Sequence, residues 1–180
     1  MAGLDLELSE QQALLRDAVT RLTSQVGAPD WAALTGQLGL GGLTLPEDQG
    51  GFGGGAVDVA VVMAALGPAL AGADWLSHAA ACAALDQGAD LASGAARAAL
   101  VSKATAASLP ELRDGNRIEG TARLVAGAAQ ASQFVVALGG SLLAVPRDAT
   151  GLTIEPGQLH DGSSVADLHF TAVTGQPLDG

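Results

Sequence analysis

The sequence has 180 residues, enough for one domain or two small ones, and carries a formal net charge of −11 with only 8 Lys and Arg residues. So few basic side chains argue against nucleic acid or an anionic membrane as a partner. Hydrophobic residues make up 48% but aromatic residues only 3%, and much of the apolar content is alanine, so we expect closely packed helices.

The first residues lack the basic and apolar regions of a signal peptide. The longest uncharged apolar run, 59–73, is too short for a membrane span and is interrupted by Gly67-Pro68. Cys82 is alone among apolar neighbours, which excludes an internal disulfide and suits a reducing compartment. We therefore expect a cytoplasmic protein in which Cys82 is a small buried side chain.

Helical signals dominate the first half. Ser9 and Gln12 form a capping-box pattern that predicts a helix ending at Gly27. Asp30 is a candidate N-cap of a short helix with Trp31 on its apolar face. Further helices are predicted over 56–66, 75–84 and 87–98.

A glycine-rich segment, 39–55, connects two of these helices and contains eight glycines and Pro46. Its end, Gly51-Phe52-Gly53-Gly54-Gly55-Ala56, matches the G-x-G-x-x-G/A dinucleotide pattern, with Asp74 at the spacing of a ribose-binding acid. That pattern requires a buried strand before the turn, and Pro46 to Gln49 do not read as one. We therefore interpret the segment as a structural connection.

The second half reads as strands. Apolar or alternating runs occur at 99–101, 117–119, 123–125, 151–154 and 165–170, and the strongest hairpin signal is 134–138 and 141–146 joined by Gly139-Gly140. Helices followed by strands predict an α+β chain. We expect an N-terminal all-α helical domain, 1–96, followed by a small antiparallel β-barrel or sandwich domain, 97–180.

The polar residues offer few constellations for chemistry. The turn 160–164 brings together a histidine, an aspartate and two serines, but neighbours in one turn rarely make a triad. His78 is isolated in a helix, His169 is expected to be exposed on a strand, and no histidine pair is spaced for a metal. Arg97 and Lys103 flank the domain junction, either as a phosphate site or, as we favour, as solvated charges.

The order of these features resembles the acyl-CoA dehydrogenase family. The resemblance rests on Leu8-Ser9-Glu10-Gln11-Gln12, on Gly39-Leu40, Pro46-Glu47-Asp48, Gly50-Gly51 and Gly53 in the glycine-rich segment, and on the apolar helix and β segments that follow. It covers the whole chain. It implies FAD as the cofactor and an acyl-CoA thioester as the substrate, with hydride transfer to the flavin.

The resemblance places the flavin contacts on two segments, Leu100-Val101-Ser102 and Leu124-Val125-Ala126. Ser102 alone could replace the family's threonine in the first, and Leu124 stands where a tryptophan usually covers the flavin. The family's catalytic glutamate is expected outside this chain, because Glu47, Glu111, Glu119 and Glu155 match no family catalytic position.

Two hypotheses remain open. The chain is part, or one subunit, of a flavin-dependent acyl-CoA dehydrogenase in a homo- or hetero-oligomer whose partner completes the site. Alternatively, it is a non-catalytic structural or acyl-CoA-binding subunit that keeps the fold without independent flavin chemistry.

Overall fold

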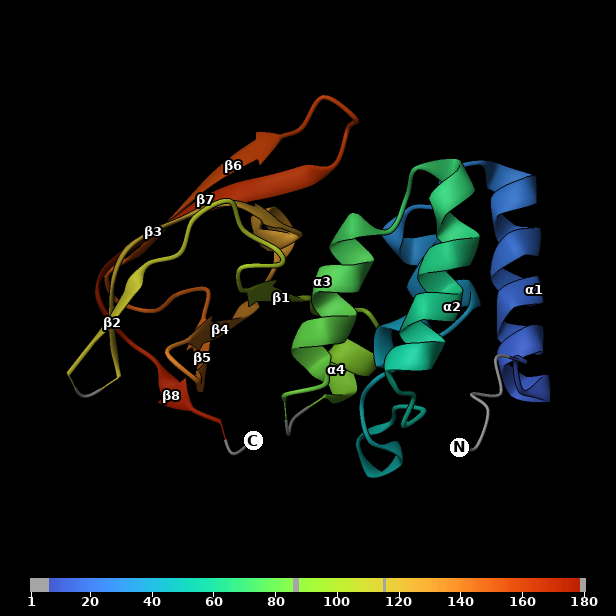
Figure 1. Cartoon of the computed structure of the whole chain (residues 1–180), viewed down its shortest axis with the longest axis horizontal. Helices are drawn as coiled ribbons and strands as arrows, with labels where there is room; N and C mark the ends of the chain where they lie inside the picture. Colours follow the sequence, from blue (N-terminus) through green and yellow to red (C-terminus); the bar gives the residue numbers. More distant parts are fainter. Residues whose placement is uncertain (1–6, 86–87, 115, 179–180) are drawn as a thin grey trace, which may run out of the picture.

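The computed structural model describes residues 7–85, 88–114 and 116–178. Helices occupy the first part of the chain and strands the second, and the two parts lie side by side (Figure 1). The helices are α1 (Glu10–Val26), α2 (Ala56–Leu66), α3 (Ala73–Cys82) and α4 (Ala89–Ala92). The strands are β1 (Ala98–Val101), β2 (Glu111–Arg113), β3 (Arg117–Ala126), β4 (Gln133–Leu138), β5 (Ser141–Pro146), β6 (Leu152–Gln158), β7 (Ser164–Thr174) and β8 (Gln176–Pro177).

Helix α1 begins with the predicted capping box. The Gln12 amide donates to Ser9 Oγ at 3.2 Å, and the Ser9 amide donates to Gln12 Oε1 at 3.1 Å. The helix buries Val19 and Leu22 in a core that includes Val62 and Leu66 of α2. No helix in the described ranges is long and apolar enough to cross a membrane.

The short helix predicted after Asp30 is present and ends in a π-helical turn, Ala33–Gln37, and Asp30 Oδ1 accepts from the Ala33 amide at 2.8 Å. The predicted helix 87–98 is shorter than expected and is reduced to α4. Gly94 stops that helix because its φ is +78°, and a β-carbon at this position would collide with the side chain of Thr35. Gln87, where the predicted helix was to start, lies outside the described residues.

The glycine-rich segment folds as two 3-10 turns, Leu40–Gly42 and Glu47–Gln49, and is bonded to α3. Trp75 Nε1 donates to the Leu40 carbonyl at 2.9 Å, and Thr44 Oγ1 donates to the Ala79 carbonyl at 2.7 Å. A side chain at Gly51 would collide with the Leu45 carbonyl. Ahead of α2, the described residues form no strand, and the dinucleotide pattern requires one there.

The β part contains two four-stranded sheets, in the orders β1-β4-β5-β8 and β2-β3-β7-β6. The predicted hairpin appears as β4 and β5, and Phe134, Val136, Leu143 and Val145 lie in the core shared by the sheets. The fold class is confirmed, with one difference: β1 pairs with β4 in parallel. That arrangement follows because the long connection 102–132 crosses over before β4 begins.

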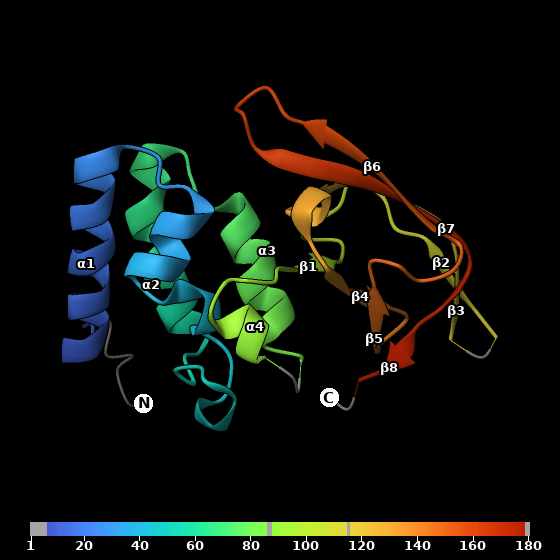
Figure 2. The ribbon, with the colours of Figure 1, turned by 180° about the vertical axis from the view of Figure 1, so that it is seen from behind.

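Helix α3 joins the two parts of the molecule by packing on β1. The Ala98 amide donates to His78 Nδ1 at 3.0 Å, and the Leu100 amide donates to Ser77 Oγ at 3.0 Å. Figure 2 shows α3 and α4 facing the β1 side of the strands. The start of the β part is therefore fixed by side chains of a helix.

Candidate functional site

The two predicted flavin-contact segments lie at the ends of two strands that belong to different sheets. Leu100-Val101-Ser102 ends β1, and Leu124-Val125-Ala126 ends β3. The loop after β1 joins them: the Ala126 amide donates to the Thr105 carbonyl at 3.2 Å, and the Ala107 amide donates to the Arg123 carbonyl at 2.7 Å. The structure thus brings the two segments together through this loop.

The six residues differ in how much of their surface is open. Val101 and Val125 are fully buried in the β core. Leu100, Ser102 and Ala126 are half-buried, whereas 43% of Leu124 is exposed. Leu124 is therefore the side chain best placed to touch a ligand.

The hydrogen-bond donors of these segments already have partners within the protein. The Ser102 amide donates to Thr105 Oγ1 at 3.1 Å, and Ser102 Oγ accepts from the Ala104 amide at 3.2 Å. The Leu124 amide donates to Asp167 Oδ1 at 2.7 Å. The polar edge of a flavin ring needs donors and acceptors that are free. These residues therefore offer an apolar wall but do not fit the hydrogen-bonding needs of a flavin on their own.

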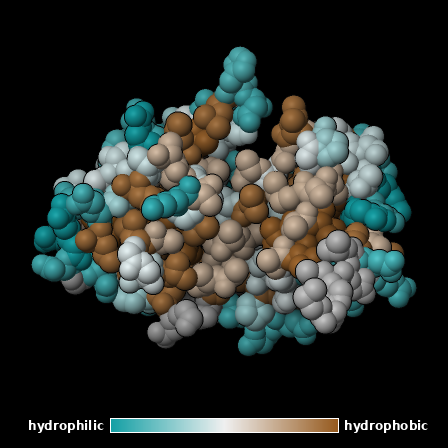
Figure 3. Space-filling view, viewed as in Figure 1, coloured by the Kyte–Doolittle hydropathy of each residue, from teal (hydrophilic) through white to brown (hydrophobic). Residues whose placement is uncertain are grey.

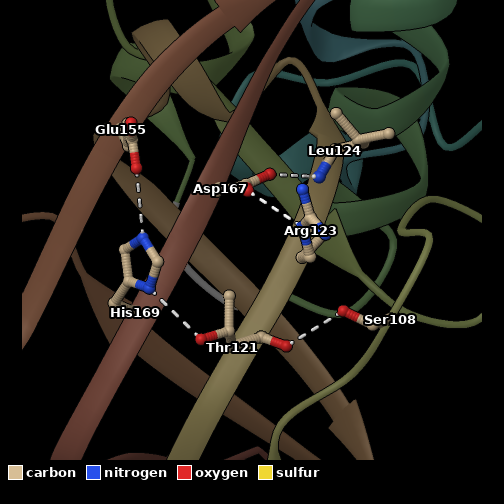
Figure 4. A network of polar contacts seen from close by, with 7 residues as sticks. All are labelled: Ser108, Thr121, Arg123, Leu124, Glu155, Asp167 and His169. Carbon is tan, nitrogen blue, oxygen red and sulfur yellow. Dashed lines mark hydrogen bonds and ion pairs between the residues drawn. The ribbon is translucent and has the colours of Figure 1, made fainter.

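Leu124 adopts an unusual conformation that Asp167 supports. Its φ is +54°, in the left-handed region, and it lies in a β-bulge where Arg123 and Leu124 of β3 oppose Asp167 of β7. The Asp167 carboxylate also accepts from Arg123 Nε at 3.2 Å (Figure 4). The hydrogen bond donated by the Leu124 amide lowers the pKa of Asp167, and the hydrogen bond and charge of Arg123 lower it further. Sequence reasoning missed Asp167, because nothing in the pattern 164–170 marks the bulge on the other strand.

A second polar group joins β3, β7 and the next strand, β6 (Figure 4). His169 Nδ1 lies 3.2 Å from Thr121 Oγ1, and its Nε2 lies 3.4 Å from Glu155 Oε2. The histidine side chain is 42% exposed. In the described part of the chain, no cluster of His, Cys, Asp or Glu could hold a metal ion.

His78 lies in helix α3, as the sequence predicts, but its side chain is bonded to two other segments of the chain. The side chain is fully buried, and Nε2 lies 2.9 Å from the Gly41 carbonyl while Nδ1 accepts from the Ala98 amide. A carbonyl only accepts, so Nε2 carries the proton. Burial lowers the pKa of His78, and the neutral ring links the glycine-rich segment, α3 and β1.

Cys82 is buried as predicted, and its Sγ lies 3.4 Å from His78 Nε2. Burial raises the pKa of the Cys82 thiol to about 12. Such a thiol remains protonated at neutral pH and is a poor nucleophile.

The predicted pair of solvated charges at the junction is half right. Lys103 is exposed, but Arg97 is half-buried, and its Cζ lies 4.4 Å from the centroid of the Trp31 ring. The turn near His160 is polar, as expected, with Asp161 Oδ1 accepting from the Ser163 amide at 2.9 Å.

Comparison with known proteins gives a fold. No family model and no curated protein matches the sequence. A solved steroid acyl-CoA dehydrogenase variant is 22% identical, with a TM-score of 0.72, and the match covers 94% of this chain and 57% of that one. The ChsE4-ChsE5 complex from Mycobacterium tuberculosis is 19% identical, with a TM-score of 0.74 over 96% of this chain and 59% of that one.

Glutaryl-CoA dehydrogenase from Mycobacterium smegmatis is 19% identical, with a TM-score of 0.67, and the match covers 97% of this chain and 56% of that one. The chain thus spans less than two thirds of the length of these solved structures. Over nearly all of its own length, it has the fold of acyl-CoA dehydrogenases.

Proposed function

We propose that this chain is part, or one subunit, of a flavin-dependent acyl-CoA dehydrogenase that desaturates an acyl-CoA thioester at its α and β carbons. The observation that carries the proposal is the match of both halves of the chain, helical and β, in one arrangement, to the ChsE4-ChsE5 complex with a TM-score of 0.74. A further similar structure, from Bacillus anthracis, is an acyl-CoA dehydrogenase complexed with FAD.

In such an assembly FAD would supply the hydride acceptor, and a carboxylate base would be needed for the α proton. Neither function is assigned to a residue of this chain. Its four candidate glutamates are all exposed: Glu47, Glu111, Glu119 and Glu155. An exposed carboxylate is not enclosed in a water-excluding site of the kind in which a general base acts on a bound substrate.

The contribution assigned to this chain is an apolar wall against the flavin and exclusion of water. Leu124 projects from the bulge, and Leu100 lies half-buried at the end of the neighbouring segment. In this proposal, the donors for the flavin and the catalytic base come from elsewhere in a homo- or hetero-oligomer. A precedent for a mixed assembly is found among the similar structures, one of which is a complex of ChsE4 with ChsE5.

A second candidate is a non-catalytic subunit that retains the fold. It is favoured by the internal partners of the Ser102 and Leu124 amides, which leave these donors occupied and closed to a ligand. Both candidates predict that the chain alone binds no flavin tightly. They differ in whether an assembly containing it turns over acyl-CoA.

The test is co-expression of this chain with the protein encoded beside it, followed by purification and visible spectroscopy. We expect the chain alone to be colourless, and the complex to be yellow and bleached by an acyl-CoA under anaerobic conditions. A colourless complex without turnover would overturn the first candidate and leave the second.

Two variants test the assigned surface in that complex. Leu124→Asp should lower flavin occupancy, because a carboxylate replaces the apolar wall. Val57→Asp is the matched control, since Val57 is 58% exposed but lies on α2 in the helical part. Equal flavin content in the two variants would contradict the role of Leu124.

A further inference from the structure

A pocket of about 410 Å³ lies where the helical part meets the turn between β6 and β7. The first turn of α3 and the segment 28–34 form one side, and Arg97 and the turn 161–164 form the other. In Figure 1, the turn of the hairpin formed by β6 and β7 points toward the helical part of the molecule. Both tryptophans of the chain, Trp31 and Trp75, line the pocket.

Arg97 is held in place within this pocket. Its guanidinium lies over the ring of Trp31, and that ring is fixed by a 2.8 Å bond from its Nε1 to the Gly94 carbonyl and by an edge contact with His78. The Arg97 carbonyl accepts from both the amide and the hydroxyl of Ser132. A fixed guanidinium can bind a ligand without the entropic cost of ordering a free side chain.

Arg97 and Asp74 both lack a hydrogen-bonding partner for their charged groups among the described residues. The two charges act on each other across the pocket, but they form no ion pair in this part of the chain. Burial raises the pKa of Asp74, and burial lowers the pKa of Arg97. Both groups are half-buried and without a hydrogen-bonding partner among the described residues, so they are open to a ligand that bonds them.

The other acidic residues of the pocket are already bonded to backbone amides. Asp30 Oδ1 accepts from the Ala33 amide at 2.8 Å, and Asp161 Oδ1 accepts from the Ser163 amide. Their negative charges, together with Asp74, disfavour an anionic ligand, and a cationic ligand could bond Asp74 only by leaving Arg97 without a hydrogen-bond acceptor. The remaining wall is apolar, with Leu34 and Trp75 almost fully buried.

The geometry points to this pocket as a binding site for a small neutral molecule with an amide group and an apolar body. The amide oxygen accepts from Arg97, its N–H donates to Asp74, and the apolar body lies against the half-buried Trp31. The site is separate from the proposed flavin wall at Leu124 and does not depend on the function proposed above.

Four aliphatic probes of one shape test this assignment: cyclohexanecarboxamide, its methyl ester analogue, cyclohexanecarboxylate and cyclohexylmethylamine. The full chain contains no tyrosine, so intrinsic fluorescence excited in the near ultraviolet reports on Trp31 and Trp75 alone. We expect the carboxamide to shift this fluorescence saturably and to bind at least about tenfold more tightly than the ester, the carboxylate or the amine. The reason is that the carboxamide alone can hydrogen-bond to both Arg97 and Asp74 while carrying no charge of its own.

Three variants separate the amide contacts from packing. Arg97→Met keeps an unbranched stem over Trp31 and should weaken carboxamide binding about tenfold or more. Asp74→Asn should weaken carboxamide binding and strengthen carboxylate binding, because it removes a negative charge from the pocket. Lys103→Met, an exposed basic residue near the same junction, is the control and should change neither.

The assignment is overturned if the carboxylate binds the wild-type chain as tightly as the carboxamide. It is equally overturned if Arg97→Met binds the carboxamide with unchanged affinity, or if none of the probes shifts the fluorescence. Circular dichroism of each variant confirms that a loss of binding is not a loss of folding.

Discussion

The bulge at Leu124 makes a quantitative prediction for Asp167→Ala. The substitution removes a charge-assisted hydrogen bond of 2.7 Å to the Leu124 amide, worth about 1.5–3 kcal/mol. The contact with Arg123 adds little, because the arginine side chain is 64% exposed. The left-handed conformation of Leu124, which costs about 1–2 kcal/mol, then loses its main support.

We therefore expect Asp167→Ala to lower the free energy of local opening at the bulge by about 2 kcal/mol, which is about a 30-fold loss of hydrogen-exchange protection at the Leu124 amide. Asp167→Asn keeps an acceptor oxygen and should lose less than half of that. The pKa of Asp167 is lowered in the folded protein, so its stabilisation is present above the ordinary Asp range and is lost as pH falls through the folded pKa.

The measurement is amide hydrogen exchange followed by NMR at neutral pH, and urea unfolding of wild type and variants at neutral and acidic pH. The stability difference between wild type and Asp167→Ala should shrink in acid. Unchanged protection of the Leu124 amide, or a stability difference independent of pH, would refute the role assigned to Asp167.

Three further predictions concern the helical part. Gly51→Ala should lower the free energy of unfolding in urea by about 3 kcal/mol, because the new Cβ collides with the Leu45 carbonyl. Gly67→Ala has open space around it and should leave stability unchanged or raise it. Equal effects of the two substitutions would contradict the close approach of Gly51 to Leu45. The free energy of unfolding should fall as pH drops below the ordinary His range, because His78 binds a proton in the unfolded state but not when buried in the folded protein. His78→Asn should flatten the dependence of stability on pH in this range. An unchanged dependence in the variant would mean that other groups cause it. Cys82 should react with a thiol reagent only as fast as the protein unfolds locally, so urea should accelerate its labelling. Rapid labelling in the native protein would contradict the burial of Cys82.

Much of the fold could be read from local signals. The Ser9–Gln12 capping box and the Gly139-Gly140 hairpin are short-range patterns, and both appear as predicted. The parallel pairing of β1 with β4 could not be predicted, because it joins segments more than thirty residues apart and neither strand carries a mark of its partner. The division at 96 and 97 stays a prediction.

The candidate site was harder to predict for the same reason. A resemblance located Leu100 to Ser102 and Leu124 to Ala126, but not the bonds that occupy their donors, which come from Thr105 and Asp167. Arg97 was recognised as a junction charge, but its stacking on Trp31 depends on a contact between segments far apart in sequence. The exposed apolar residues of the chain, including Phe52, Leu70 and Leu124, were likewise visible only in three dimensions, and Figure 3 shows apolar surface over both parts of the molecule.

The hydrogen bonds from the amides of β1 to the side chains of α3 have a consequence for aggregation. An edge strand normally exposes a row of amides that can recruit a strand from another molecule. On β1, the outward amides of Ala98 and Leu100 are occupied by His78 and Ser77, so helix side chains stand where a neighbouring strand would bind. The helical part thus protects this sheet from edge-to-edge association. A β part expressed without α3 would expose that edge and should self-associate.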